Sequence, residues 1–389
     1  MILQILRMGG NIIAVIALAV LSIITPNWAK VKVTQVQVLF RHGERTPLSK
    51  ELYPNDIYNI STYDEWGLGQ LTNTGKMREY QLGMVLKDRY KDLLGPTYVH
   101  SDVYALSSNF DRTKMSLQLV LAALFPPSAN QVWNPDLPWM PIPIHSVPQS
   151  IDILFRAHEC PKFQEAYSRI ERLPHFQEQF AIHKNFFEFL SETTGLNITD
   201  PVPIYEIQGL LAAQKGMNLT LPEWCTQAVF DHMNEVAVLY YHMRSYTPEV
   251  KRLESGPLVK KFIDNMKLDR TQEKPRKIYL YSGHEITVSA FLKAHGILEP
   301  KIPLFGTAVM VELLQNKSGK RFIRMMLWTG VTEQLKTLRL PGCRSICRIE
   351  KYLELTREII PSQEELDCHY RRLTPSVFRG FTDDQVYYN

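Results

Sequence analysis

Short apolar runs and amphipathic stretches alternate in the N-terminal third of the chain. Residues 33–40 (VTQVQVLF) are rich in apolar and β-branched side chains and predict a buried strand. Residues 73–93 carry apolar side chains at helical spacing, directly after Thr72, which suits a helix N-cap. Residues 103–106 predict a second strand and residues 111–124 a second helix. This alternation is typical of an α/β fold with a largely parallel sheet.

The middle of the chain has a different pattern. Residues 134–148 are rich in proline and indicate a boundary. Residues 149–251 show helical patterns, many aromatic side chains and few strand signals. We therefore expect an α/β core formed by residues 30–148 and 252–389, interrupted by an inserted α-helical cap domain at 149–251.

The last third returns to strands. Residues 277–281 (KIYLY) predict a strand, and the following Ser-Gly-His-Glu leads into a helix that ends near Ala294. Residues 307–314 and 321–328 are apolar stretches joined by a turn that contains Asn-Lys-Ser-Gly, which predicts a β-hairpin.

The N-terminus predicts export. Residues 12–24 form a mostly apolar run, and Pro-Asn-Trp-Ala follows, so residues 1–29 are typical of a signal peptide with cleavage near Ala29. A membrane anchor is the alternative, but the run is shorter than the roughly 20 residues that span a bilayer. We expect a secreted, extracellular product with no membrane span in its mature form.

Glycosylation sites and cysteines fit an oxidising export route. The Asn-x-Ser/Thr sequons begin at Asn59, Asn197, Asn218 and Asn316. The cysteines are Cys160, Cys225, Cys343, Cys347 and Cys368. Their odd number means that at least one is free or pairs between chains. Because the chain has no Cys-x-x-Cys and no Cys/His cluster at zinc spacing, we expect no metal and no cofactor.

Composition excludes some classes of protein. Hydrophobic residues make up 45% of the chain and charged residues 22%, which is ordinary for a globular protein. The formal net charge is +4, and no block of five basic residues occurs, so a nucleic-acid partner is not expected.

The candidate chemistry begins where the first predicted strand ends. Arg41-His42-Gly43-Glu44-Arg45 places an imidazole between two guanidiniums, which match phosphate oxygens in pairs. This edge of an α/β sheet is where ligands bind. The alternative is structural: one arginine pairs with Glu44 and His42 merely packs.

The longer string around His42 resembles the histidine acid phosphatase family, which includes the prostatic, lysosomal and insect venom enzymes. Residues 41–47 (RHGERTP) fit that family's R-H-G-x-R-x-P signature. Residues 69–75 resemble its G-Q-L-T-x-x-G element, and residues 107–113 its S-x-x-x-D-R-T element. Residues 282–285 (SGHE) lie where the family carries His-Asp. The resemblance implies a phosphoglycerate-mutase-like three-layer core with a mainly parallel sheet and a helical cap.

The resemblance also implies roles for six residues. His42 would be the nucleophile that forms a phosphohistidine, and Glu285 the catalytic acid. The phosphoryl group would be bound by Arg41, Arg45, Arg112 and His284. Neighbouring cations should lower the pKa of His42 from its ordinary value of about 6.5, and so keep the imidazole neutral in acid.

Glu285 departs from the family's usual aspartate. From the ordinary glutamate pKa of about 4.3 we expect an acidic optimum, on the order of pH 4.5–6. The alternative for Glu285 is a residue favoured at a helix N-terminus by the dipole. We expect Asp111 to cap a helix and His158 to be structural.

The resemblance implies disulfides between Cys160 and Cys368 and between Cys343 and Cys347, with Cys225 left without an evident partner. It also suggests a homodimer. The substrate is expected to be a small-molecule or protein phosphomonoester. Two alternatives stay open: a phytase or inositol-polyphosphate phosphatase of the same family, and a secreted binding protein without activity.

Overall fold

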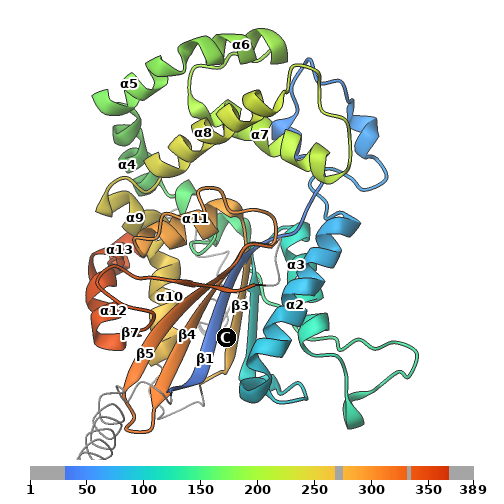
Figure 1. The fold of residues 1–389 in the computed structure, drawn as a ribbon, viewed down its shortest axis with the longest axis vertical. Coiled ribbons are helices and arrows are strands. Elements are labelled where there is room, and N and C mark those ends of the chain that lie inside the picture. The colour runs from blue at the N-terminus through green and yellow to red at the C-terminus, as the bar shows by residue number, and fades with distance from the viewer. Residues whose placement is uncertain (1–30, 268–274, 331–333, 368–389) are drawn as a thin grey trace, which may run out of the picture.

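The computed structural model describes residues 31–267, 275–330 and 334–367 (Figure 1). The predicted signal peptide at residues 1–29 and Cys368 lie outside the described residues. In the part that is described, no helix is both long and apolar enough to cross a membrane.

Seven strands of the described residues form one sheet in the order β2-β3-β1-β4-β5-β6, with β7 beside β5. The strands are β1 (Val31–Arg41), β2 (Val103–Ser107), β3 (Ile278–Gly283), β4 (Ala308–Asn316), β5 (Arg321–Trp328), β6 (Lys336–Leu338) and β7 (Cys347–Arg348). Each strand predicted from an apolar run is present.

The sheet is mixed, which corrects the prediction of a mainly parallel sheet. β1 and β2 both run parallel to β3. β4 and β5 form the predicted hairpin, and β4 pairs with β1 in antiparallel register. The short strands β6 and β7 add two more antiparallel pairs with β5. β4 and β5 run in opposite directions because a short turn joins them. Since β4 also runs antiparallel to β1, the part of the sheet from β1 to β6 is antiparallel.

Helices cover both faces of the sheet, which gives three layers (Figure 1). Alternate side chains of β1 point to opposite faces. Val38 packs in the cluster that contains helices α2 (Asn73–Leu94) and α3 (Asp111–Leu124). Leu39 packs in the cluster of the other face, with the helices α10 (Gly256–Lys267), α11 (Glu285–Ala294) and α12 (Ile349–Thr356). The α/β class is therefore confirmed.

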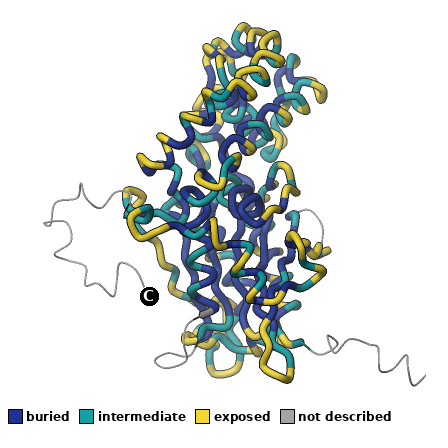
Figure 2. The backbone as a smooth tube through the Cα atoms, turned by 90° about the vertical axis from the view of Figure 1, so that its left-hand side faces the viewer, coloured by how far each residue is buried: buried dark blue, intermediate teal, exposed yellow. Residues whose placement is uncertain are grey.

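A group of helices lies beyond one end of the sheet (Figure 1). It comprises α4 (Pro161–Glu171), α5 (Pro174–Ile182), α6 (Lys184–Thr194), α7 (Pro201–Gly216) and α8 (Gln227–Met243). These helices have apolar clusters of their own, and Figure 2 shows buried segments inside the group. The short helices α9 (Pro248–Glu254) and α13 (Gln363–Leu366) complete the α-helices of the described residues.

Two cysteine predictions can be compared with the structure. A disulfide joins Cys343 and Cys347, the pair that the resemblance implied. Cys225 is a free thiol, buried in an apolar cluster with α7 and α8. The predicted bond between Cys160 and Cys368 stays a prediction, because Cys368 is outside the described residues.

Candidate active site

The site forms where β1 and β3 end side by side. Arg41 is the last residue of β1 and is aligned in parallel register with Gly283, the last residue of β3. The backbone N–H of His42 donates to the backbone oxygen of Gly283 over 3.1 Å. Arg41 and His42 therefore lie beside His284 and Glu285, although the two segments are far apart in the sequence.

The turn after His42 is held by contact between two glycines. A Cβ atom on Gly43 would lie 2.4 Å from the backbone oxygen of Gly75, in the first turn of α2. The side chain of Thr72 caps this helix by accepting from the N–H of Gly75 over 3.2 Å. The N–H of Thr72 donates to the backbone oxygen of Glu44 over 2.9 Å. Two sequence motifs thus fit together because neither glycine has a side chain.

The imidazole of His42 is 1% exposed, and its Nδ1 atom lies 2.8 Å from the backbone oxygen of Gly43. A carbonyl oxygen can only accept, so Nδ1 carries the proton and a neutral ring has its lone pair on Nε2. Burial lowers the pKa of His42 well below 6.5, and the positive charges of Arg112 and Arg41 lower it further. Both effects favour the neutral ring, whose Nε2 lone pair is then available.

Three guanidiniums surround this ring. The Nε atoms of Arg41, Arg45 and Arg112 are buried, and none has a hydrogen-bond partner among the described residues. Arg41 Nε lies 3.2 Å from Glu285 Oε2 as an ion pair without hydrogen-bond geometry. The Arg41 guanidinium stacks on the ring of Phe305 at 3.9 Å. Buried cationic donors without acceptors are costly, and they are suited to binding an anion.

Arg45 and Arg112 have different surroundings. Both terminal nitrogens of Arg45 donate to the carboxylate of Glu51, over 2.8 and 2.5 Å. The Arg112 guanidinium stacks on Phe110 at 4.6 Å. Burial, followed by the charge of Arg45, lowers the pKa of Arg112 to about 10, so it still carries its charge in acid and at neutral pH.

His284 approaches His42 from the end of β3. The two ring centroids are 5.6 Å apart in an edge-to-face arrangement. His284 Nε2 lies 3.0 Å from the hydroxyl of Ser108, which follows β2. Burial and the charge of Arg112 lower the pKa of His284 well below 6.5. Residues after three neighbouring strands therefore converge on one point.

Glu285 is the first residue of α11 and contacts both the core and the helical group. Its Oε1 accepts a hydrogen bond from the hydroxyl of Tyr205 on α7, and its Oε2 faces Arg41. Burial raises the pKa of Glu285, but Arg41, His42 and His284 outweigh burial, and the net pKa lies well below 4.5. These protein groups therefore favour the carboxylate, whereas the sequence suggested an ordinary glutamate pKa.

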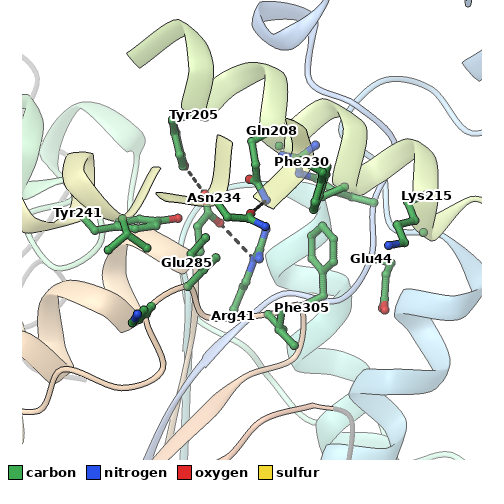
Figure 3. Close-up of a pocket in the computed structure, with 18 of the residues that line it drawn as sticks. Arg41, Glu44, Tyr205, Gln208, Lys215, Phe230, Asn234, Tyr241, Glu285 and Phe305 are labelled. Carbon is green, nitrogen blue, oxygen red and sulfur yellow. Dashed lines mark hydrogen bonds and ion pairs between the residues drawn. The ribbon is translucent and has the colours of Figure 1, made fainter. Parts of the chain in front are cut away.

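A cavity of about 650 Å³ opens beside these groups (Figure 3). Arg41, Arg45 and Glu285 line it, whereas His42, Arg112 and His284 are not among its lining residues. Its apolar and aromatic wall includes Tyr205, Phe230, Val238, Tyr241, Leu304 and Phe305. Sequence patterns did not single out Tyr205 or Glu51.

Asp111 was predicted to cap a helix, and its position can be compared with that prediction. Asp111 is the first residue of α3 and not its N-cap, which is Phe110. Its carboxylate accepts from the side chain of Gln70 over 3.3 Å, so the capping prediction is wrong.

His158 has a strongly lowered pKa. Burial, followed by the positive charge of Arg244, lowers it to about 3. Among the described residues, no group of three or more His, Cys, Asp or Glu side chains could hold a metal ion.

Comparison with known proteins places this site in a family. A model of the histidine phosphatase superfamily (branch 2) matches residues 32–327. The chain is 40% identical over 365 residues to venom acid phosphatase of Apis mellifera, covering 92% of this chain and 93% of that protein. It is 33% identical over 354 residues to prostatic acid phosphatase of Homo sapiens, covering 90% of each.

A solved structure shares the fold. The Hafnia alvei phytase in complex with myo-inositol hexakis sulphate has a TM-score of 0.66 and 14% identity, covering 86% of this chain and 98% of that chain. At this identity the likeness shows a shared fold and no more. The family model and the two relatives match this chain in sequence, and they therefore show the family. The chain therefore belongs to the histidine phosphatase superfamily (branch 2), as the histidine acid phosphatase motifs around His42 predicted.

Proposed function

We propose that the protein is a secreted acid phosphatase that hydrolyses phosphate monoesters through a phosphohistidine on His42. The observation that carries this proposal is the set of buried Nε donors of Arg41, Arg45 and Arg112 around the His42 imidazole, none of which is hydrogen-bonded within the described residues. Such donors bind phosphoryl oxygens, and each charge-assisted hydrogen bond contributes about 1.5–3 kcal/mol. His284 would be a further donor.

In the first step the lone pair of His42 Nε2 attacks phosphorus. The bond between phosphorus and the ester oxygen breaks, and its electrons stay on the leaving oxygen. Glu285 donates a proton to that oxygen, which leaves as an alcohol. The imidazole becomes a phosphorylated cation, and the backbone oxygen of Gly43 holds its Nδ1 proton.

Glu285 must therefore gain a proton, although the surrounding protein groups favour its carboxylate form. The negative oxygens of a bound phosphoryl group would offset the charge of Arg41, the strongest of the influences that hold the carboxyl pKa down. Substrate binding should consequently raise the pKa of Glu285 and be coupled to proton uptake. In acidic solution this uptake is favourable, which supports an acidic optimum.

In the second step a water oxygen attacks phosphorus. The carboxylate of Glu285 takes a proton from this water, and the bond between phosphorus and His42 Nε2 breaks. Inorganic phosphate leaves, His42 is neutral again and Glu285 is protonated. The sum of both steps is one ester and one water converted to one alcohol and one phosphate.

A phytase is the second candidate within the family, since solved phytases share the fold. The cavity lining favours a less charged leaving group. Three of its basic residues face acidic partners, in the pairs Arg41–Glu285, Arg45–Glu51 and Arg78–Glu44. The other two basic lining residues are Lys215 and Lys301, with Glu235 in the same lining. An inositol polyphosphate would need more unpaired cations than this wall offers.

We also propose that residues 149–251 act as a cap over a core formed by residues 30–148 and 252–389. Support comes from the cavity, which has walls from α7 and α8 as well as from the end of β1. Secretion is supported by the pattern of residues 1–29 and by the likeness to a venom protein. Glycosylation at the four sequons and a homodimer stay predictions.

The test compares wild type with His42→Ala on p-nitrophenyl phosphate at pH 5. The variant should be inactive, and ³²P from a labelled substrate should be trapped on His42 in an alkaline quench, in which phosphohistidine survives. His100→Ala, which changes an exposed histidine, is the control and should keep its activity. Equal hydrolysis by wild type and His42→Ala would refute the mechanism. Inactivity of the wild type toward every phosphate ester would favour a binding protein.

A further inference from the structure

A tyrosine on the helical group makes direct contact with the proposed acid. The hydroxyl of Tyr205, on α7, donates to Oε1 of Glu285, on α11 (Figure 3). The ring of Tyr205 packs against Tyr240 at 5.0 Å and against Tyr241 at 5.8 Å, both from α8. The hydroxyl is therefore fixed by packing within the helical group and does not depend on Glu285 for its position.

The two carboxylate oxygens of Glu285 have different partners. Oε1 faces Tyr205, and Oε2 lies 3.2 Å from Arg41 Nε. A carboxylate held at both oxygens by groups from two parts of the fold has one orientation. An aspartate at this position would be shorter by one methylene, and on an unchanged backbone it would not reach both partners.

The charged and titratable groups that act on Glu285 come from every element packed against it. They are Arg41 and His42 from the end of β1, Arg45 from the turn, Arg112 from α3, His284 beside it in the sequence, Tyr205 from α7 and Tyr241 from α8. Within the described part of the chain, Tyr205 is the one group among these that donates a hydrogen bond to the carboxylate. Its hydroxyl is neutral in acid, so it acts as a donor and not as a charge.

We propose that Tyr205 is a positioning residue for the reaction: it holds Glu285 from the helical group and favours its carboxylate form. This inference rests on the proposed function, in which Glu285 must gain and then lose a proton. A donor hydrogen bond to the carboxylate disfavours protonation. Tyr205 would thereby determine the pH at which the acid form of Glu285 is lost, and would make this pH depend on the placement of α7.

Tyr205→Phe tests the proposal because it removes the hydroxyl and keeps the ring. The carboxylate loses a donor, the pKa of Glu285 rises, and the enzyme should retain its acid form to higher pH. We expect the alkaline limb of kcat against pH, measured with p-nitrophenyl phosphate, to move upward by about one pH unit. Tyr246→Phe, on an exposed ring of the helical group, should leave the limb in place.

A double variant distinguishes an effect that acts through the contact between Tyr205 and Glu285 from a general loss of activity. In a Glu285→Asp background the carboxyl is one methylene shorter, and on an unchanged backbone we expect it to lose the contact with Tyr205, so adding Tyr205→Phe should not move the alkaline limb again. A fall of kcat by the same factor at every pH, with an unmoved limb, would show a merely structural tyrosine and overturn the proposal. Equal shifts in both backgrounds would overturn it as well. Thermal unfolding of each variant identifies any loss of folded protein.

His42→Ala, assayed in parallel, distinguishes the two levels of inference. If His42→Ala is inactive while Tyr205→Phe and wild type have superimposable pH profiles, the role of Tyr205 is refuted and the phosphohistidine mechanism stands. If His42→Ala is active, both the mechanism and the role of Tyr205 are refuted.

Discussion

Glu51 binds both terminal nitrogens of Arg45, with Nη2 at 2.5 Å and Nη1 at 2.8 Å from its carboxylate oxygens. Both side chains are nearly buried, at 3% and 6% exposure. Glu51 also accepts from the backbone N–H of Leu48 over 2.8 Å, which fixes the carboxylate. The pair orients the Arg45 guanidinium, and its Nε has no hydrogen-bond partner in the described part of the chain.

We expect Glu51→Gln to destabilise the ligand-free protein, because it leaves a buried cation without its counter-charge. Removing one partner of a buried pair costs about 3–5 kcal/mol, and the retained amide oxygen should keep the loss near the lower figure. Phosphate should recover part of this loss, so the rise of Tm on adding phosphate should be larger in Glu51→Gln than in wild type. Chemical unfolding measures the loss of stability, and thermal unfolding with and without phosphate measures the rise of Tm.

The control is Glu206→Gln, which changes an ion pair with Lys50 in the same neighbourhood. Lys50 is 62% exposed in this pair, and exposed pairs contribute at most about 1 kcal/mol. If Glu51→Gln were no less stable than Glu206→Gln, the buried pair of Arg45 and Glu51 would not stabilise the folded protein as we expect.

Arg112 lowers the pKa of His42, second only to burial among the causes. Arg112→Met should therefore raise this pKa, so that the imidazole becomes protonated at higher pH. The acid limb of kcat/KM should move upward by about one pH unit. Loss of a phosphate donor should also lower kcat/KM throughout, by roughly 10- to 100-fold. Substrate ionisation is common to both proteins, so it does not affect the difference.

Arg156→Met is the matched control for this pH shift. Arg156 also stacks on Phe110, at 5.3 Å, but forms an ion pair with Glu159. Its replacement should leave the acid limb where it is in wild type. An acid limb that moves equally in both variants would mean that general loss of charge, and not Arg112, determines the titration of His42.

Much of the site could be predicted because its residues follow strands. Buried apolar runs marked β1, β2 and β3, and polar residues directly after them indicated convergence at one edge. The direction of β4 relative to β1 could not be read in the same way. A strand buried on both faces has a nearly continuous apolar pattern, which is the same for parallel and antiparallel neighbours.

Contacts between distant segments were beyond sequence patterns. Tyr205 lies 80 residues from Glu285, within a helix whose spacing indicates only packing. Glu51 is close to Arg45 in sequence, six residues away in a short 3-10 helix, but charge alone does not indicate that the two form a bidentate pair. The low pKa of Glu285 likewise depends on the positions of Arg41 and His284, which the fold determines.

The contact between Gly43 and Gly75 gives a prediction about the turn that carries His42. A Cβ atom on residue 75 would lie 2.2 Å from the backbone oxygen of Glu44, and backbone cannot move aside as a side-chain tip can. Gly75→Ala should therefore displace the turn, with a stability loss of about 1–3 kcal/mol and a fall in kcat of at least tenfold. Thr74→Ala, at an exposed neighbouring position, should change neither quantity. Wild-type activity in Gly75→Ala would show that the turn tolerates separation from α2.

Glu79, on the inner face of α2, gives a prediction about stability and pH. Its side chain is fully buried, and neither carboxylate oxygen has a hydrogen-bond partner among the described residues. Burial, followed by the charge of Glu44, raises its pKa well above 4.5. Below the ordinary pKa both folded and unfolded chains keep the proton. As pH rises above it, the unfolded chain releases the proton first, so this group lowers stability toward neutral pH.

Glu79→Met keeps a similar volume and removes this titration. The free energy of unfolding of the variant relative to wild type should therefore increase from pH 4 to pH 7, by about 1.4 kcal/mol for each unit of the pKa shift. Asp88→Asn, on the same helix at a position 84% exposed, should show almost no such increase. Urea unfolding at several pH values measures the difference. If the difference in the free energy of unfolding between Glu79→Met and wild type were the same at every pH, Glu79 would have an ordinary pKa and this prediction would be wrong.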